Sequence, residues 1–196
     1  ENMKPLTATG MSLQAFASKL DHPRWLYVLP NGDVLVAETN APAQPKDSQG
    51  IKGWITQWIK NKAGSGKASA NRITLLRDAD GDGEAEIREV FIENLNSPFG
   101  MALIGNDFYV ANTDAVIKFP YTFGITQISK PGIKVLELPA GSINHHWTKN
   151  LIASQDGTRL YVTVVSNSNI AENGMEQELG RAAIWEVNPK LGSYRI

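Results

Sequence analysis

The sequence predicts an all-β fold made of short antiparallel strands, and three features of the chain point to that class. Its 196 residues include 17 glycines and 10 prolines, which favours frequent turns over long helices. A phrase consisting of a turn and a short apolar strand occurs three times along the chain. Between these phrases lie further short segments rich in Val, Ile, Leu and Phe, the residues that favour strands.

The composition excludes several kinds of function. The 19 basic and 20 acidic residues nearly cancel, so no basic face for a nucleic-acid partner is expected. Cysteine is absent, which removes disulfides, thiolate catalysis and cysteine-ligated metals. No apolar run approaches the roughly 20 residues of a membrane span, and no signal peptide is visible. The length suits one large domain or a piece of a longer protein, and it allows a real core.

The repeated phrase reads "LPNGDVLVAET" at 29–39, "LIGNDFYVANT" at 103–113 and "SQDGTRLYVTVV" at 154–165. In each copy a turn that contains glycine precedes the apolar residues. The dipeptides Asn-Gly at 31–32 and Asp-Gly at 156–157 favour tight turns, because these residues tolerate positive φ. Each phrase therefore predicts a turn followed by a strand.

The spacing of the phrases indicates β-propeller blades. Equivalent positions, Asp33, Asp107 and Arg159, lie 74 and 52 residues apart. Removing an insertion at 41–70 from the longer interval leaves about the 40–50 residues of a four-stranded blade. The remaining strands are expected at 71–78, 86–93, 115–121, 133–139 and 182–189. We interpret residues 1–196 as a single partial propeller domain of about three blades, with a β-sandwich as the alternative.

Three blades cannot close a ring, because propellers typically have 4–8 blades. We therefore expect the chain to be a fragment of a longer protein. Neighbouring blades share their core, so the first and third blades should each leave one apolar face uncovered. These faces should bind the remainder of the propeller or a second copy of the chain.

The insertion at 41–70 contains a predicted amphipathic helix in "GIKGWITQWIKNK". Its apolar side chains recur at the helical period, at Ile51, Trp54, Ile55, Trp58 and Ile59. The Trp-rich face with lysines around it could dock on a membrane surface. The alternative is that this face packs on its own domain.

An acidic stretch, "DADGDGEAE" at 78–86, is a candidate calcium site. Asp78, Asp80 and Asp82 alternate, and Glu89 stands at the twelfth position counted from Asp78. This spacing of oxygen ligands is that of an EF-hand loop. An EF-hand also requires flanking helices, whereas both flanks here are predicted strands. A solvated acidic turn between two strands is therefore the alternative to a calcium site.

Two of the chain's three histidines are adjacent in "GSINHHWTKN" at 141–150. In an extended segment Asn144 and His146 would share one face, and His145 and Trp147 the other. Joint metal binding by both rings is then awkward, and no Gly-x-Ser-x-Gly nucleophile motif is present. A single imidazole can still act as a general base, since imidazole exchanges its proton near neutral pH. A purely structural histidine is the alternative.

Five stretches together resemble the glucose/sorbosone dehydrogenase family, especially its L-sorbosone dehydrogenase-like branch. They are "HPRWLYVLPNGDVLVAET", "NRITLLRDADGDGEAE", "SPFGMALIGNDFYVANTDAVIKFPY", "HHWTKNLIASQDGTRLYVTVVSNSN" and "RAAIWEVNP". The resemblance implies a six-bladed propeller that uses pyrroloquinoline quinone (PQQ) and Ca²⁺ to oxidise an aldose or a sorbosone-type sugar. It also implies a periplasmic or secreted location, and it does not name the electron acceptor.

The resemblance also implies roles for particular residues. The family's base lies five residues before the leucine that opens a strand, and counting back from Leu151 gives His146. The implied cofactor-binding residues are His145, Asn167, Asn169 and Arg181. Asn167 departs from the family, in which arginine is frequent at that position. The Gly-x-Arg-Asn-Pro segment that binds the quinone in this family has no counterpart in the sequence.

Two other functions fit the same sequence. One is a propeller that binds or organises partners without redox chemistry. The other is a calcium-dependent propeller of the lactonase type.

Overall fold

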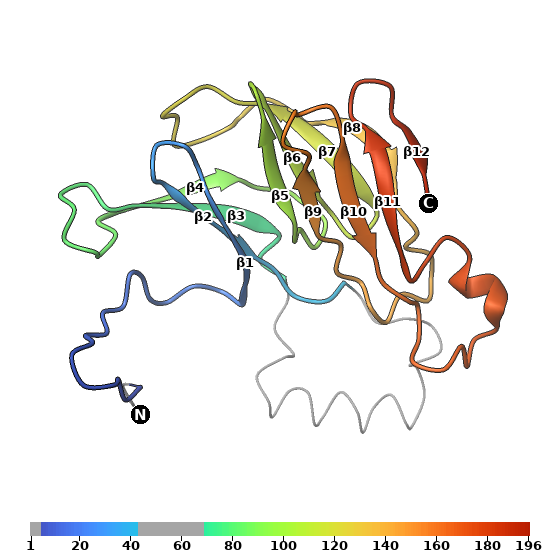
Figure 1. The fold of residues 1–196 in the computed structure, drawn as a ribbon, viewed down its shortest axis with the longest axis horizontal. Coiled ribbons are helices and arrows are strands. Elements are labelled where there is room, and N and C mark those ends of the chain that lie inside the picture. Colours follow the sequence, from blue (N-terminus) through green and yellow to red (C-terminus); the bar gives the residue numbers. More distant parts are fainter. Residues whose placement is uncertain (1–4, 43–68) are drawn as a thin grey trace.

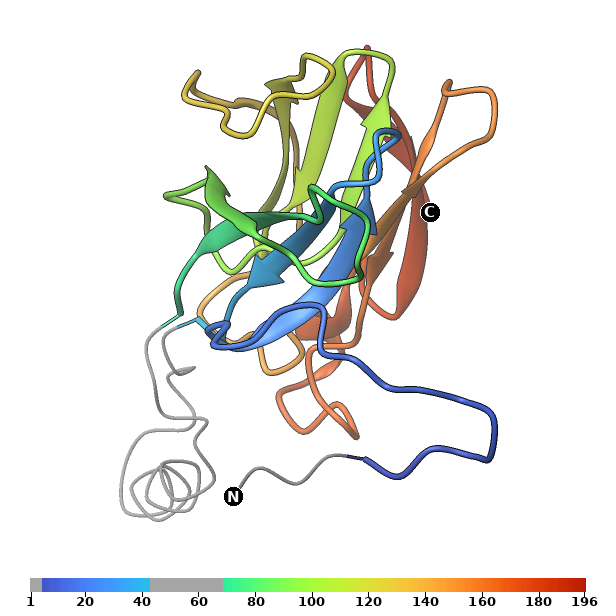
Figure 2. The same cartoon turned by 90° about the vertical axis from the view of Figure 1, so that its left-hand side faces the viewer.

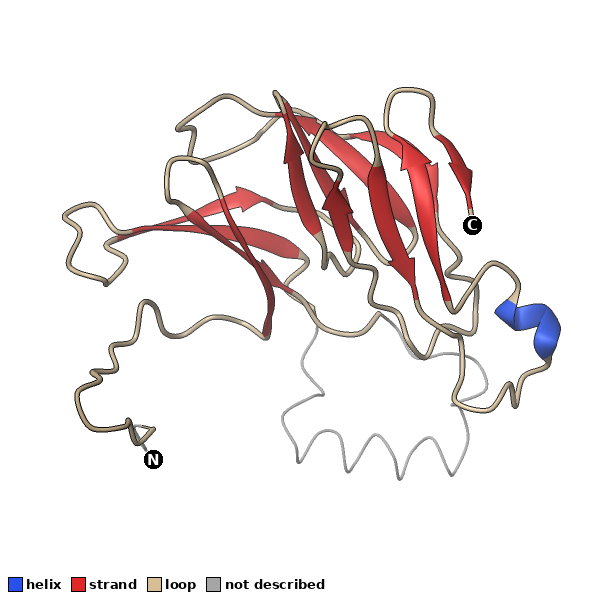
Figure 3. Cartoon of the chain, viewed as in Figure 1, coloured by secondary structure: helices blue, strands red, loops and turns tan. Residues whose placement is uncertain are grey.

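The computed structural model describes residues 5–42 and 69–196 and consists of three four-stranded antiparallel sheets (Figures 1 and 3). Helical structure in these residues is limited to one short 3₁₀ helix, η2 (Met175–Glu178). The predicted all-β class is confirmed, and the sheets have the strand number and pairing of three propeller blades.

Each sheet is built from four strands that are consecutive in the chain. The first contains β1 (Pro23–Val28), β2 (Val34–Glu38), β3 (Arg72–Arg77) and β4 (Ile87–Ile92). The second contains β5 (Met101–Ile104), β6 (Asp107–Ala111), β7 (Ala115–Pro120) and β8 (Ile133–Glu137). The third contains β9 (Leu151–Ala153), β10 (Leu160–Val164), β11 (Ala183–Asn188) and β12 (Ser193–Arg195). Strand β5 contacts both β1 and β9, so the first strands of the three sheets are neighbours (Figure 2).

The sequence pattern located most of these strands. The three repeated phrases contain β2, β6 and β10, and the five other predicted segments contain β3, β4, β7, β8 and β11. Gly32 and Gly157 take the expected positive φ, 91° and 67°, at the turns before β2 and β10. Turn chemistry and apolar strand residues therefore predicted the local structure correctly.

The three sheets pack on one another through two hydrophobic cores, one between each pair of neighbouring sheets. One lies between the first and second sheets, where Phe91 of β4 meets Phe108 of β6 edge to face at 5.6 Å. The other lies between the second and third sheets and contains Val116, Val162 and Trp185. Successive cores of this kind are those of stacked blades, whereas a β-sandwich has one core between two sheets.

Gly100 allows the second and third sheets to approach closely beside the histidine loop. A Cβ at this position would lie 2.3 Å from the backbone nitrogen of Leu151 and 2.7 Å from Oδ1 of Asn150. The Gly100 amide donates to the carbonyl of Lys149 at 3.1 Å. Only a residue without a side chain fits here, so Gly100 fixes the position of the chain just before β9.

The outer faces of the first and third sheets differ, although both were expected to be uncovered. On the third sheet, Ile152 and Ile184 are 66% and 62% exposed. On the first sheet, Val36 and Leu76 point away from the shared core but are 0% and 2% exposed. On the same face Leu26 and Val28 of β1 are 61% and 62% exposed, so the first sheet is covered at Val36 and Leu76 and open along β1.

The N-terminal segment contributes to covering the first sheet. The Arg88 guanidinium donates to the carbonyls of Ser18 and Lys19 at 3.1 and 3.0 Å. Residues 15–19 line the same hollow as Leu76. These contacts were missed because the segment has no strand or helix periodicity.

The predicted insertion falls between β2 and β3, which nevertheless pair directly. The amide of Asn40 donates to Oγ of Ser69 at 2.9 Å, so the two ends of the insertion meet. The predicted helix at 51–59 lies outside the described residues. Within the residues that are described, no helix is long and apolar enough to cross a membrane.

Candidate functional site

The paired histidines lie in a bent loop that precedes β9, not in an extended segment. Asn144 and Trp147 are 8% and 7% exposed, whereas His145 is exposed and His146 is half-buried. The expected alternation of two faces is therefore wrong, because bends at 145 and 146 break the two-residue period. The bends give the two adjacent imidazoles different environments.

Trp147 anchors this loop where the three sheets meet. Its ring packs edge to face on Phe99 at 6.5 Å, and the guanidinium of Arg24 lies 5.7 Å from its centroid. Its carbonyl accepts a hydrogen bond from Oγ1 of Thr113 at 2.9 Å. Arg24 belongs to the first sheet, while Phe99 and Thr113 flank strands of the second. Packing by all the sheets therefore holds the residue next to His146 in place.

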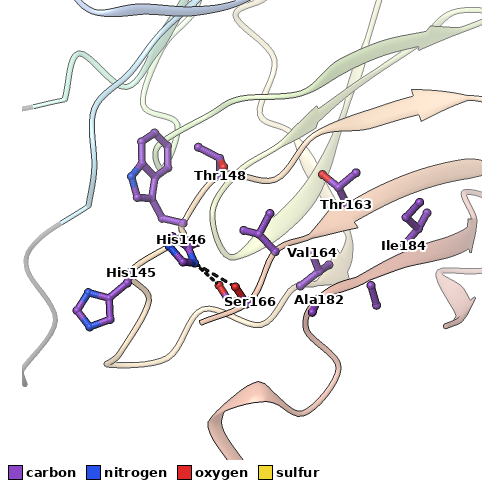
Figure 4. Close-up of a pocket in the computed structure, with 11 residues that line it drawn as sticks. His145, His146, Thr148, Thr163, Val164, Ser166, Ala182 and Ile184 are labelled. Carbon is purple, nitrogen blue, oxygen red and sulfur yellow. Dashed lines mark hydrogen bonds between the residues drawn. The ribbon is translucent and has the colours of Figure 1, made fainter. Parts of the chain in front are cut away.

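His146 is oriented by Ser166, which follows β10. Its Nδ1 lies 3.0 Å from the carbonyl oxygen of Ser166 and 3.2 Å from its Oγ (Figure 4). A carbonyl can only accept, so the contact with it requires the proton on Nδ1. In the neutral ring, Nε2 is then the atom with a free lone pair. This is the arrangement of a general base.

A cavity of about 660 Å³ adjoins His146. Its walls are formed by His145, His146, Trp147, Thr148, Thr163, Val164, Val165, Ser166, Ala182, Ala183 and Ile184. Three of these residues carry hydroxyl groups, which can hydrogen-bond a polyhydroxylated molecule. Figure 4 shows that His146 points toward Ser166 while His145 points elsewhere.

The residues predicted to bind a cofactor are only partly brought together. His145 lines the cavity, whereas Asn167, Asn169 and Arg181 do not. Asn167 is fully buried, and neither polar atom of its side chain has a hydrogen-bond partner in the described part of the chain. Asn169 is exposed. The role predicted for these four residues stays a prediction.

Arg181 holds the histidine loop in this structure. Its guanidinium donates to Oδ1 of Asn144 at 3.0 Å and to the carbonyl of Ala140 at 2.8 Å. Burial lowers the pKa of Arg181 from its usual value, and the nearby Glu178 carboxylate opposes that shift. Arg181 is therefore a cation fixed behind the loop that carries His146.

Lys149 is a buried cation that the sequence analysis did not identify. Its side chain is 0% exposed, and Nζ has no hydrogen-bond partner among the residues described. Burial, with a contribution from the positive charge of Arg181, lowers the pKa of Lys149 to about 8. In the sequence it is one lysine in a loop, and no local pattern indicates its burial.

The acidic loop joins β3 and β4, so the expected strands on both sides are confirmed. Ligand atoms of Asp78, Asp80, Asp82 and Glu86 lie within 4.8 Å of one another. Glu89 is not in this group, because it lies within β4 opposite Leu75. The fourth carboxylate of the group is thus that of Glu86, which the EF-hand spacing does not select, and not that of the predicted Glu89.

The Asp78 carboxylate also organises the loop. It accepts hydrogen bonds from the amides of Gly81 and Gly83 at 2.6 and 2.9 Å. The bond from Gly83 is the main cause of the lowered pKa of Asp78. These contacts stabilise an acidic turn by themselves, and calcium binding here stays a prediction.

Calcium titration of two glutamine variants tests that prediction. If the loop holds Ca²⁺, Glu86→Gln should weaken binding at least tenfold, because one carboxylate of the group is lost. Glu89→Gln is the matched control and should leave the affinity unchanged. Calorimetry measures both, and absence of a binding heat in the unmodified protein would show that the loop is an ordinary acidic turn.

Comparisons with known proteins identify the fold. No family model matches the chain, and no curated protein matches it. Among solved structures, the holo PQQ domain of pyranose dehydrogenase from Coprinopsis cinerea is 16% identical with a TM-score of 0.64. A calcium structure of a carbohydrate-active enzyme of family AA12 from Trichoderma reesei is 16% identical with a TM-score of 0.66. A putative oxidoreductase (glucose dehydrogenase) from Thermus thermophilus is 18% identical with a TM-score of 0.54.

The chain spans less than half the length of these proteins. The matches cover 89%, 95% and 91% of this chain but 35%, 40% and 47% of the respective structures. At such identities the likeness concerns the fold. The chain has the fold of part of a β-propeller, shared with part of each of these oxidoreductase structures.

Proposed function

We propose that this chain is part of a PQQ-dependent dehydrogenase that oxidises an aldose or a sorbosone-type sugar, with His146 as the general base. The observation that carries the proposal is the contact between Nδ1 of His146 and the Ser166 carbonyl, at 3.0 Å, beside a hydroxyl-lined cavity. The fold supports it, because the similar structures include a PQQ domain and a glucose dehydrogenase-like oxidoreductase. The periplasmic or secreted location remains part of the proposal.

The described residues fit one side of a PQQ site. PQQ carries three carboxylates and needs several cationic or hydrogen-bond donors around them. The residues lining the cavity supply imidazole and hydroxyl groups but no lysine or arginine. Lys149 and the Asn167 side chain are buried polar groups near this loop with no hydrogen-bond partner in the described ranges, yet neither lines the cavity. In this proposal the chain supplies the base, and the cationic contacts to PQQ come from other parts of the protein.

His146 would act on the sugar hydroxyl. Nε2 accepts the hydroxyl proton as the carbon–hydrogen bond breaks, and the imidazolium is stabilised by the Ser166 carbonyl at Nδ1. Bound PQQ would supply the acceptor for the hydride that leaves the sugar carbon. Trp147, held by Phe99 and Arg24, keeps the backbone of the loop fixed while the proton moves.

The open face of the third sheet should bind a further blade of the same protein. Ile152 and Ile184 are exposed there, flanked by the ion pair of Glu186 and Arg195 at 2.9 Å. The two interfaces inside this chain are formed by apolar sheet faces of the same kind. The similar solved structures are more than twice as long as the part this chain matches. A second copy of the chain is the alternative occupant.

Reconstitution of the full-length protein with PQQ and Ca²⁺ tests the proposal. With an aldose and a dye acceptor, we expect dye reduction that requires all the added components. The 196-residue chain alone should give none, because the cationic contacts and the neighbouring blade are missing. Hydrolysis of a sugar lactone with Ca²⁺ and without PQQ would instead support a lactonase. Absence of both activities would favour a binding or scaffold propeller.

A further inference from the structure

The residues directly after Ser166 are held by the Glu178 carboxylate. Glu178, at the end of η2, accepts hydrogen bonds from the amides of Asn167 and Ser168 at 2.6 and 3.0 Å. It also accepts one from Oγ of Ser168 at 2.8 Å. Burial raises the pKa of Glu178, but these hydrogen bonds outweigh it and the pKa is lowered. Glu178 is thus ionised at neutral pH and fixes the two residues that follow Ser166.

The loop on the other side of His146 is held through Arg181. Arg181 donates to Asn144, and Nδ2 of Asn144 donates to Oγ1 of Thr113 at 2.9 Å. Oγ1 of Thr113 in turn donates to the carbonyl of Trp147. Asn144 and Trp147 flank the two histidines, so this chain of hydrogen bonds fixes both ends of the pair.

Glu178 and Arg181 are three residues apart in the segment between β10 and β11. One holds the loop with the acceptor carbonyl, and the other holds the loop with the imidazole. Neither lines the cavity beside His146. Their separate contacts meet at one hydrogen bond, that between Nδ1 of His146 and the Ser166 carbonyl.

We propose that Glu178 and Arg181 are positioning residues that set the tautomer of His146, keeping the proton on Nδ1 and leaving Nε2 as the proton acceptor. The relevance of this arrangement to catalysis rests on the proposed function. The arrangement itself does not depend on the proposed function, because it follows from hydrogen bonds within this chain.

Glu178→Gln in the full-length protein tests the inference. The glutamine side chain has the same shape as that of glutamate, but its NH₂ group must face a backbone N–H that needs an acceptor. The loop carrying Ser166 therefore loses a hydrogen bond. We expect the ¹⁵N NMR signals of His146 to change from those of an Nδ1-protonated ring to those of a mixture of tautomers. We also expect kcat for sugar oxidation to fall by about 10²-fold with little change in KM, since the base is misplaced.

Two further variants make the experiment specific. Glu176→Gln changes an exposed glutamate of the same 3₁₀ helix and should alter neither measurement. Ser168→Ala removes one of the three hydrogen bonds to Glu178, so it should shift the tautomer signal in the same direction by a smaller amount. This variant keeps the inference testable if Glu178→Gln does not fold.

The outcomes separate this inference from the proposed function. Unchanged ¹⁵N signals in a folded Glu178→Gln or Ser168→Ala protein would overturn the inference, whatever the activity. A changed tautomer in a protein that shows no sugar oxidation would support the inference while contradicting the proposed function. A changed tautomer together with reduced kcat would support both.

Discussion

Replacing His146 with alanine should lower kcat for sugar oxidation by about 10²- to 10⁴-fold, the contribution of a general base. Nε2 is the free acceptor of a ring fixed by Ser166, and the other imidazole that lines this cavity, that of His145, points away from Ser166. Binding of PQQ should be largely retained, because the His146 imidazole is assigned to accepting the sugar proton and not to binding the PQQ carboxylates. Dye-linked steady-state assays and PQQ titration measure the two effects.

His145→Ala is the matched control for this experiment. The exposed His145 ring lines the same cavity but points away from Ser166 (Figure 4). Its removal should cost much less activity. Equal losses in the two variants, or activity that survives in His146→Ala, would remove His146 from the role of base.

The free energy of unfolding should rise as the pH increases from about 8 to 10.5, because of Lys149. Burial lowers its pKa from 10.5 to about 8, so over this range the unfolded chain binds a proton that the folded chain does not. Stability must then increase with pH, and a shift of this size corresponds to about 3 kcal/mol. Below pH 8 the full cost of burying the charged ammonium remains. Urea unfolding at several pH values measures the trend.

Lys149→Met should abolish that rise and stabilise the chain at pH 7 by about 1–3 kcal/mol, since an apolar side chain replaces a buried cation without a partner. Lys134→Met is the control: Lys134 is exposed and paired with Glu137, so its loss should change little. If Lys149→Met is instead less stable at pH 7, the ammonium has an anionic partner in solution.

Local rules explain how much of the fold could be predicted. The turn at Gly32 and the apolar residues of β2 are specified within about ten residues, and the same holds for β10 after Gly157. Strand period and turn chemistry operate over this range. The partial cover on the first sheet could not be predicted, because residues 15–19 line the same hollow as Leu76, and bond to Arg88 through Ser18 and Lys19, without any periodic pattern.

The sequence by itself predicted most of the strands, the approximate spacing of the blades and the histidine loop as the candidate site. Which imidazole is oriented, and by which partner, was decided by tertiary structure. His146 meets Ser166 across 20 residues of sequence, Thr113 reaches Trp147 across 34, and Arg181 reaches Asn144 across 37. The burial of Lys149 and the grouping of Glu86 with Asp78 likewise depend on how chain segments fold against one another. The physical reason is that strand propensity is a property of neighbouring residues, whereas hydrogen-bond partners and burial exist only after the sheets have packed.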